Sequence, residues 1–211
     1  MNLTELQRDA LAEMANISAS RAAKQLSLLL RDHIEITTPS VEVATFDELT
    51  GRLEPMAGGP GLACVYQELS GAIEGRIHLV FHDEGSKSLV HALVGEAVML
   101  TEETLRAYEH EAMTEVGNII ISTFAAMLAD LVGTEIRLGI PSYAEGRTRQ
   151  VLCAGHDPEA GAGEGVIVIE TVLRAAEQDV SGAVMVVLRI DSLAHLLRQL
   201  DVLVGDHAGA E

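Results

Sequence analysis

The pattern of hydrophobic and polar positions predicts a long amphipathic helix near the start of the chain, over residues 4–30. Apolar residues recur there at spacings of four, four and three, at Leu6, Ala10, Met14 and Ile17. Thr4 stands just before this pattern and belongs to the residue types that cap helix N-termini. We therefore expect a helix that begins at Thr4 and carries these residues on its apolar face.

The remaining pattern predicts strands and further helices in the same order in both halves of the chain. Residues 33–46 alternate, are rich in β-branched side chains and are interrupted by Pro39, which predicts extended structure with a break or an edge. The other elements expected in the first half are a Gly/Pro connection, a hairpin and a short helix, over residues 51–61, 61–69 with 75–81, and 85–94. The second half predicts a long helix, an extended segment, a Gly-rich loop, a hairpin and a helix, over residues 101–131, 135–140, 154–165, 166–173 with 183–190, and 191–200.

An internal repeat explains why the two halves follow one plan. At a constant offset of 102 residues, identical residues coincide in the pairs Ala10/Ala112, Glu13/Glu115, Asn16/Asn118, Ile17/Ile119, Ser20/Ser122, Ala23/Ala125, Leu26/Leu128, Leu29/Leu131, Ile34/Ile136, Pro39/Pro141 and Ser40/Ser142. The sequence therefore predicts a tandem duplication of a helix, strand, hairpin, helix unit.

Two of the polar coincident pairs, Glu13/Glu115 and Asn16/Asn118, indicate chemistry. Glu and Asn are three residues apart in each long helix, which places their side chains on one helical face, and Asp9 and Glu111 lie one turn earlier. Asn is a mediocre helix former, yet it stands mid-helix in both halves. An amide can donate and accept hydrogen bonds, and so can orient a water molecule for hydrolysis. Solvated helix residues are the simpler alternative, and the recurrence of the pair argues against it.

Composition and charge narrow the choice of partners. Apolar residues make up 48% and charged residues 22% of the 211 residues, which is typical of a globular domain. The chain has 14 Lys and Arg against 32 Asp and Glu, a net charge of −18, so its surface should repel nucleic acid and anionic membranes. The acidic N-terminal segment does not fit a signal peptide, and no uncharged apolar stretch reaches the length of a membrane span. We expect a cytoplasmic protein without membrane insertion.

Motifs for other chemistries find little support. His78 and His82 share one strand face without a nearby third ligand, so the pattern does not favour a metal site. Gly161, Gly163 and Gly165 precede a strand and do not join a strand to a helix, which indicates a loop and not a dinucleotide site. No nucleophile or phosphate-loop motif occurs, and we expect neither a metal nor a cofactor of the protein's own.

The repeated pattern resembles the motif of the CheC, CheX and FliY phosphatases of chemotaxis. That motif is an acidic residue or Ser, Glu after three residues, Asn after two more and Pro after 22 more, and the first half fits it at Asp9, Glu13, Asn16 and Pro39. The second half fits with the same spacing at Glu111, Glu115, Asn118 and Pro141, although Asp or Ser is usual at the position of Glu111. The arrangement of two motifs is most similar to that of CheC.

The resemblance implies a fold and an activity. It implies one α/β domain over residues 1–211, built from two repeats of about 1–100 and 101–205 with pseudo-two-fold symmetry, and with two long helices that carry the sites. The implied activity is hydrolysis of the aspartyl phosphate of a CheY-type response regulator, whose own site supplies Mg²⁺. The two Asn would orient the attacking water, the two Glu would contact a regulator lysine, and both Pro would shape the strand after each helix.

Two questions stay open at this level. Relatives of CheC also pair with the receptor deamidase CheD, so an adaptor for CheD or for the flagellar switch is the alternative function. In addition, Gly117 precedes the second Asn whereas Ala15 precedes the first. If the Gly leaves room for a partner, the second site should be the more active and Ala15→Gly should strengthen the first.

Overall fold

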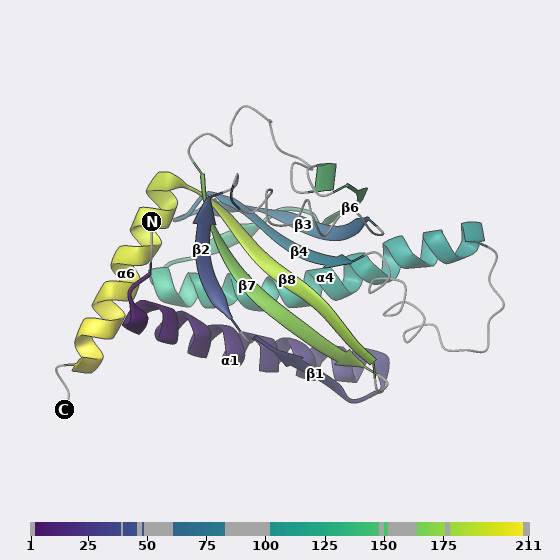
Figure 1. Cartoon of the computed structure of the whole chain (residues 1–211), viewed down its shortest axis with the longest axis horizontal. Coiled ribbons are helices and arrows are strands. Elements are labelled where there is room, and N and C mark those ends of the chain that lie inside the picture. Colours follow the sequence, from purple (N-terminus) through teal and green to yellow (C-terminus); the bar gives the residue numbers. More distant parts are fainter. Residues whose placement is uncertain are drawn as a thin grey trace.

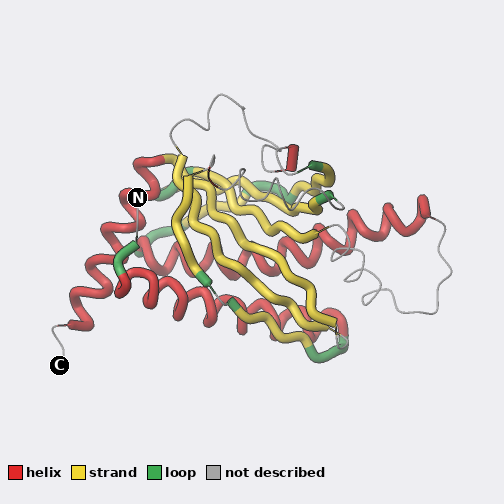
Figure 2. The backbone as a smooth tube through the Cα atoms, viewed as in Figure 1, coloured by secondary structure: helices red, strands yellow, loops and turns green. Residues whose placement is uncertain are grey.

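Two long helices cover one face of a curved eight-stranded sheet (Figures 1 and 2). The computed structural model describes residues 3–38, 40–45, 48, 61–82, 102–147, 150–151, 164–175 and 178–208. The expected helix at 85–94, the Thr101 cap and most of the Gly-rich loop lie outside these ranges. The described part confirms a mixed α/β fold, as expected from the sequence.

The first helix, α1, spans Glu5–Leu30, and Thr4 caps it. The Thr4 hydroxyl oxygen accepts a hydrogen bond from the Gln7 amide at 3.2 Å, while the Gln7 side chain accepts one from the Thr4 amide at 2.9 Å. This reciprocal arrangement satisfies two donors at the helix start. The predicted helix and its N-cap are both confirmed.

The buried face of α1 differs from the predicted one. Leu6 and Ile17 are 62% and 45% exposed, whereas Ala10 and Met14 are half-buried and pack against the core, so only part of the expected apolar stripe contacts the core. The fully buried apolar residues lie on another side of the helix, and three of these five are alanines: Leu11, Ala15, Ala19, Ala22 and Leu26. Small side chains let neighbouring elements approach closely, and they contribute little to a pattern dominated by large apolar residues. The helix was therefore predicted correctly, and its buried face only in part, since Ala10 and Met14 contact the core but Leu6 and Ile17 do not.

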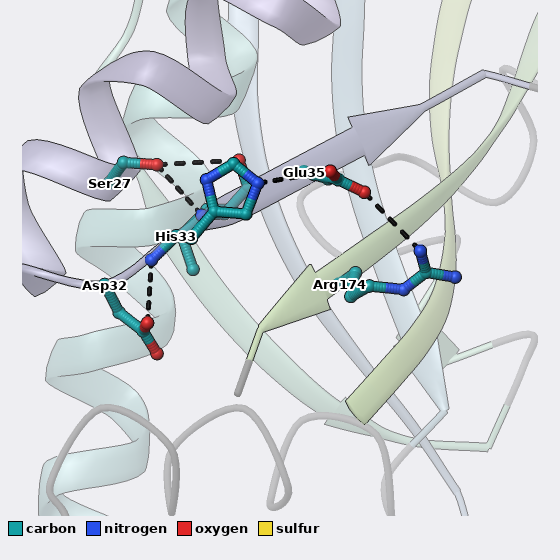
Figure 3. A network of polar contacts seen from close by, with 6 residues as sticks. Ser27, Asp32, His33, Glu35 and Arg174 are labelled. Carbon is teal, nitrogen blue, oxygen red and sulfur yellow. Dashed lines mark hydrogen bonds and ion pairs between the residues drawn. The ribbon is translucent and has the colours of Figure 1, made fainter. Parts of the chain in front are cut away.

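Polar contacts fix the turn from α1 into the first strand (Figure 3). Arg31 ends the helix in the left-handed conformation, with φ of 55°. The Ser27 hydroxyl accepts a hydrogen bond from the Ile34 amide at 3.0 Å, which ties the last turn of the helix to β1. Arg174 Nη1 donates to Glu35 at 3.5 Å and links β1 to the neighbouring strand β7.

The strands divide into two hairpins and four short strands. The bounds are β1 Ile34–Thr37, β2 Val41–Thr45, β3 Leu62–Gly71, β4 Gly75–His82, β5 Ile136–Leu138, β6 Ser142–Gly146, β7 Glu164–Ala175 and β8 Gln178–Arg189. The hairpins β3–β4 and β7–β8 confirm the prediction, as does the break between β1 and β2, where Pro39 itself lies outside the described residues. Strand β6 is an addition, because extended structure was expected only over residues 135–140.

The short strands of each half of the chain pair with the hairpin of the other half. Strands β1 and β2 pair with β7, β5 and β6 pair with β3, and β4 pairs with β8 at the centre of the sheet. All of these pairings are antiparallel. The halves are therefore interleaved in one sheet, in the order β1-β7-β8-β4-β3-β5.

The second long helix, α4, spans Glu102–Val132 and packs against α1. By length and composition its Tyr108–Val132 stretch could cross a membrane, with a mean hydropathy of 1.5 over 18 residues. In the fold, 61% of that window is buried inside the protein, which is typical of a core helix. The last helix, α6, spans Ile190–Ala208 and packs against both long helices, and Gln7 on α1 donates to Asp201 on α6 at 2.6 Å.

Candidate functional site

The first candidate site lies on the exposed face of α1 and consists of Asp9, Glu13 and Asn16. All three side chains are exposed, and the helical spacing of four and three residues aligns them along the axis. Leu6 and Ile17 occupy the same side of the helix and are exposed as well. A carboxylate and an amide thus lie between two large apolar side chains at the surface.

A buried threonine holds the amide of Asn16. The Thr38 hydroxyl donates a hydrogen bond to Asn16 Oδ1 at 2.5 Å. Thr38 follows β1 and is only 5% exposed. Because one lone pair of Oδ1 is engaged, the amide is fixed about its side-chain torsions, and its Nδ2 hydrogens point away from Thr38. This contact joins the middle of α1 to the connection between β1 and β2.

The second candidate site lies on α4 and consists of Glu111, Glu115 and Asn118. Both glutamates are exposed and Asn118 is half-buried. The Gln67 side-chain amide donates to Asn118 Oδ1 at 3.0 Å, and Gln67 lies on β3 with 1% of its surface exposed. An open hollow of about 550 Å³ lies beside the glutamates and is lined by His110, Glu111, Ala112, Thr114 and Glu115. Both asparagines are therefore anchored through the carbonyl oxygen.

Gly117 serves the packing of α4 on the sheet and not the approach of a partner. The residue is buried, and a Cβ placed on it would lie 2.5 Å from Cβ and Cγ1 of Val65 on β3. Ala15, at the corresponding position of α1, is fully buried too. The expectation that Gly117 leaves room for an incoming protein is therefore wrong. Its physical role is to let α4 come close enough to β3 for Gln67 to reach Asn118.

The two motif prolines occupy the connection that follows each site helix and its first strand. Pro141 lies between β5 and β6 and is half-buried, whereas Pro39 is outside the described residues. Thr38, directly before Pro39, is the residue that bonds Asn16. A residue before Pro is restricted to extended conformations, which favours a fixed position for the Thr38 hydroxyl.

Other titratable groups do not form a competing centre within the described ranges. His78 is a buried core residue, with Nδ1 3.7 Å from Cys64 Sγ and its ring stacked on Tyr66. Burial raises the pKa of the Cys64 thiol, so it stays protonated and is a poor nucleophile. No group of three His, Cys, Asp or Glu side chains is arranged to hold a metal ion there.

Two residues of the candidate site, Thr38 and Gln67, stand outside the repeated motif. The signal for Gln67 is a polar residue at an inward position of β3, between Val65 and Leu69, which both belong to the main core cluster. Thr38 is marked only by its place directly before the motif proline. Neither signal identifies the partner, because both hydrogen bonds join residues that are distant in the sequence.

The sequence matches of this chain lie among proteins named for chemotaxis. Residues 6–43 match the model of the CheC-like family, and residues 63–163 match the model of chemotaxis phosphatase CheX. The CheY-P phosphatase CheC of Bacillus subtilis (strain 168) is 24% identical over 172 residues, which cover 80% of each chain. By these matches the chain is similar to the CheC, CheX and FliY proteins, as its motif spacing predicts.

Solved structures share the fold at low sequence identity. FliY of Thermotoga maritima has a TM-score of 0.70 at 22% identity, and the match covers 95% of this chain and 98% of FliY. The FliM middle domain of H. pylori has a TM-score of 0.62 at 14% identity, with 93% and 99% covered. A Borrelia burgdorferi CheX, solved in a CheX–CheY–BeF3–Mg²⁺ complex, has a TM-score of 0.54 at 17% identity, with 84% and 97% covered. These similarities show the fold alone.

Proposed function

We propose that the protein is a phosphatase that hydrolyses the aspartyl phosphate of a phosphorylated CheY-type response regulator. The observation that carries the proposal is a Glu and Asn pair on each long helix, with both Glu and Asn16 exposed, Asn118 half-buried, and each Asn held through its side-chain carbonyl oxygen. The similarity to a CheY-P phosphatase and to a CheX solved with CheY supports the same substrate. An internal duplication with pseudo-two-fold symmetry accounts for the presence of two such sites in one domain.

In this reaction the protein positions the attacking water and the regulator, and it forms no covalent intermediate of its own. A water oxygen bonds to phosphorus, the bond from phosphorus to the aspartyl oxygen breaks, and the products are inorganic phosphate and a free carboxylate. Asn16 and Asn118 orient the water in line with that bond, and Glu13 and Glu115 contact a regulator lysine. Mg²⁺ enters with the regulator and neutralises charge on the phosphoryl oxygens. A positioned polar group of this kind contributes roughly 10² to 10³ in rate.

Exposed apolar residues beside the sites support a protein substrate. Leu6 and Ile17 lie beside the Glu and Asn of α1, and Tyr108, 46% exposed, stands on α4 at the position that corresponds to Leu6. Apolar and aromatic side chains next to a small polar group are typical of protein interfaces. The acidic surface suits a partner whose active site supplies the cations. We expect this encounter to occur in the cytoplasm.

Phosphate release from the cognate regulator tests the proposal. The regulator is phosphorylated and its decay is followed with and without the protein, which we expect to accelerate decay by about 10² or more. The double variant Asn16→Ala/Asn118→Ala should lose nearly all of this acceleration at unchanged helicity. Gln25→Ala removes an exposed amide from α1 away from the motif and is the matched control. An unchanged decay rate with the wild-type protein would reject the proposal.

An adaptor for CheD or for the flagellar switch is the second candidate function. The similarity to the FliM middle domain favours it, because that fold occurs in a component of the switch. The two candidates differ in what they require of the asparagines: an adaptor needs its surface, whereas a phosphatase needs both amides. Cells that carry the double Asn variant and signal normally would favour the adaptor.

A further inference from the structure

We propose that Thr38 and Gln67 are positioning residues for the reaction, each fixing the amide of one asparagine. The inference rests on the proposed phosphatase function and extends it to two residues outside the motif. Thr38 Oγ1 donates to Asn16 Oδ1 at 2.5 Å, and Gln67 Nε2 donates to Asn118 Oδ1 at 3.0 Å. Both asparagines are therefore held at the same atom, although the two donors differ in residue type and in origin.

Burying a polar side chain costs folding free energy, so the presence of these buried donors requires an explanation. Gln67 is 1% exposed, and its neighbours on the same face of β3, Val65 and Leu69, are core residues. A polar side chain inside an apolar core destabilises the fold unless it is hydrogen-bonded, and an apolar residue of similar size is tolerated there. Asn118 is the partner that Gln67 meets. A polar residue at this position is thus best explained by the orientation of Asn118.

Anchoring the carbonyl oxygen decides which edge of the amide faces outward. An exposed Asn side chain samples several rotamers, and its oxygen and nitrogen exchange places on rotation of the terminal torsion. With one lone pair of Oδ1 held by a buried donor, the two Nδ2 hydrogens are directed away from that donor, and they can donate to a water or phosphoryl oxygen. Within the described residues, Nδ2 of neither asparagine has a hydrogen-bond partner. The water-binding edge is therefore preorganised before the substrate arrives.

The two sites obtain their donor by different routes. The position that corresponds to Thr38 in the second half is Ile140, which is 88% exposed and has no polar side-chain atom. The position that corresponds to Gln67 is Ile169, which is buried and apolar. Consequently Thr38 serves the first site from its own half, while Gln67 reaches the second site from the other half. Each donor should therefore affect one site far more than the other.

Single-site proteins make this difference measurable. Asn118→Ala leaves only the first site, and Asn16→Ala leaves only the second. We expect Thr38→Val, which keeps the side-chain shape, to lower kcat about tenfold in the first-site protein with KM for the phosphorylated regulator nearly unchanged. Gln67→Met should do the same in the second-site protein. When Thr38→Val is placed in the second-site protein, or Gln67→Met in the first-site protein, the factor by which kcat falls should be at least five times smaller. Thr37→Val, at an exposed position of β1, is the matched control.

Two further measurements separate positioning from general damage to the fold. Thr38→Ser keeps the hydroxyl and should restore the kcat of the first-site protein. The side-chain amide resonances of Asn16 should shift in Thr38→Val, and those of Asn118 in Gln67→Met, while backbone resonances elsewhere in both helices stay in place. Equal losses in both backgrounds, or no change in kcat or in these resonances, would overturn the inference. A wild-type protein without phosphatase activity would instead overturn the proposed function itself.

Discussion

Glu13 and Glu115 each lie one helical turn before an anchored asparagine, and both carboxylates are exposed. An exposed carboxylate gains little from a cation that stays in water, because solvent screens the pair. The interaction becomes stronger when a partner covers the pair and excludes water. The contribution of these glutamates is therefore expected in the complex with the regulator and not in the free protein.

Neutralising the two glutamates should weaken substrate binding. We expect Glu13→Gln/Glu115→Gln to raise KM for the phosphorylated regulator about tenfold, which corresponds to about 1.4 kcal/mol, with a smaller change in kcat. Steady-state hydrolysis at two salt concentrations measures both parameters, and KM of the variant should depend less on salt than that of the wild type. The control Asp130→Asn/Glu170→Gln removes the same charge at exposed positions away from both sites. An equal rise of KM in this control would mean that only net charge matters.

The site is only partly predictable at the scale of residues. The spacing of Glu13 and Asn16 in a helix places both on one face, and this follows from the helical period alone. The donors Thr38 and Gln67 lie 22 and 51 residues from their asparagines. Their contacts depend on how helix and strand pack, and no local pattern encodes that distance.

At the scale of elements, the close approach of α4 to β3 depends on Gly117. A Cβ at this position would lie 2.5 Å from Val65, well inside van der Waals contact. In α1 the corresponding Ala15 is fully buried, so a methyl group is accommodated at that position. The difference between Gly and Ala therefore reflects helix–sheet packing. The close packing of α4 on β3 accompanies the hydrogen bond from Gln67 to Asn118.

A methyl group at Gly117 should destabilise the protein and disturb the second site. Ala favours a helix by up to about 1 kcal/mol over Gly, but overpacking costs about 1–3 kcal/mol, so we expect a net loss in Gly117→Ala. Denaturant unfolding measures it. Gly205→Ala in α6 is the matched control, because a Cβ there meets nothing within 4 Å, and this variant should be stabilised. A gain of stability in both variants would contradict this prediction, because it would show that Val65 can move aside for the added methyl group.

The elements themselves were largely predictable, with instructive exceptions. Recurring apolar residues and helix caps identified the long helices, and β-branched runs with turn residues identified both hairpins. Strand β6 was not predicted, because its sequence SYAEG is short and does not alternate between apolar and polar residues. It is extended because it pairs with β3. The buried face of α1 was predicted only in part, since Leu11, Leu26 and several alanines, and not Leu6 and Ile17, lie fully buried against the core.

At the scale of the whole molecule, the interleaved sheet joins the two halves. The pairings of β1 and β2 with β7, and of β5 and β6 with β3, cross between halves, and both long helices share one core. Neither hairpin keeps all its neighbours if the other half is removed. This arrangement makes the folding of each half depend on the other half.

We therefore expect the protein to unfold in one cooperative transition. Circular dichroism, which follows helices, and side-chain resonances of both hairpins should give coincident midpoints in urea, because unfolding of one half removes partners of the other. Residues 1–100 expressed alone should show little protection of their β3 amides from hydrogen exchange. Two separate transitions, or a stably folded half, would contradict a single domain.

The pairing of β1 with β7 also determines when each site can be completed during synthesis. Ile34 pairs with Ala175, so β1 and β2 cannot form their strand pairs before the C-terminal hairpin has been synthesised. Thr38 lies between these two strands and cannot be fixed before they are paired. Gln67, by contrast, lies in a hairpin whose two strands are adjacent in the chain, and α4 follows it directly in the order of described elements. The site on the first helix to be made is therefore the last to acquire its final geometry.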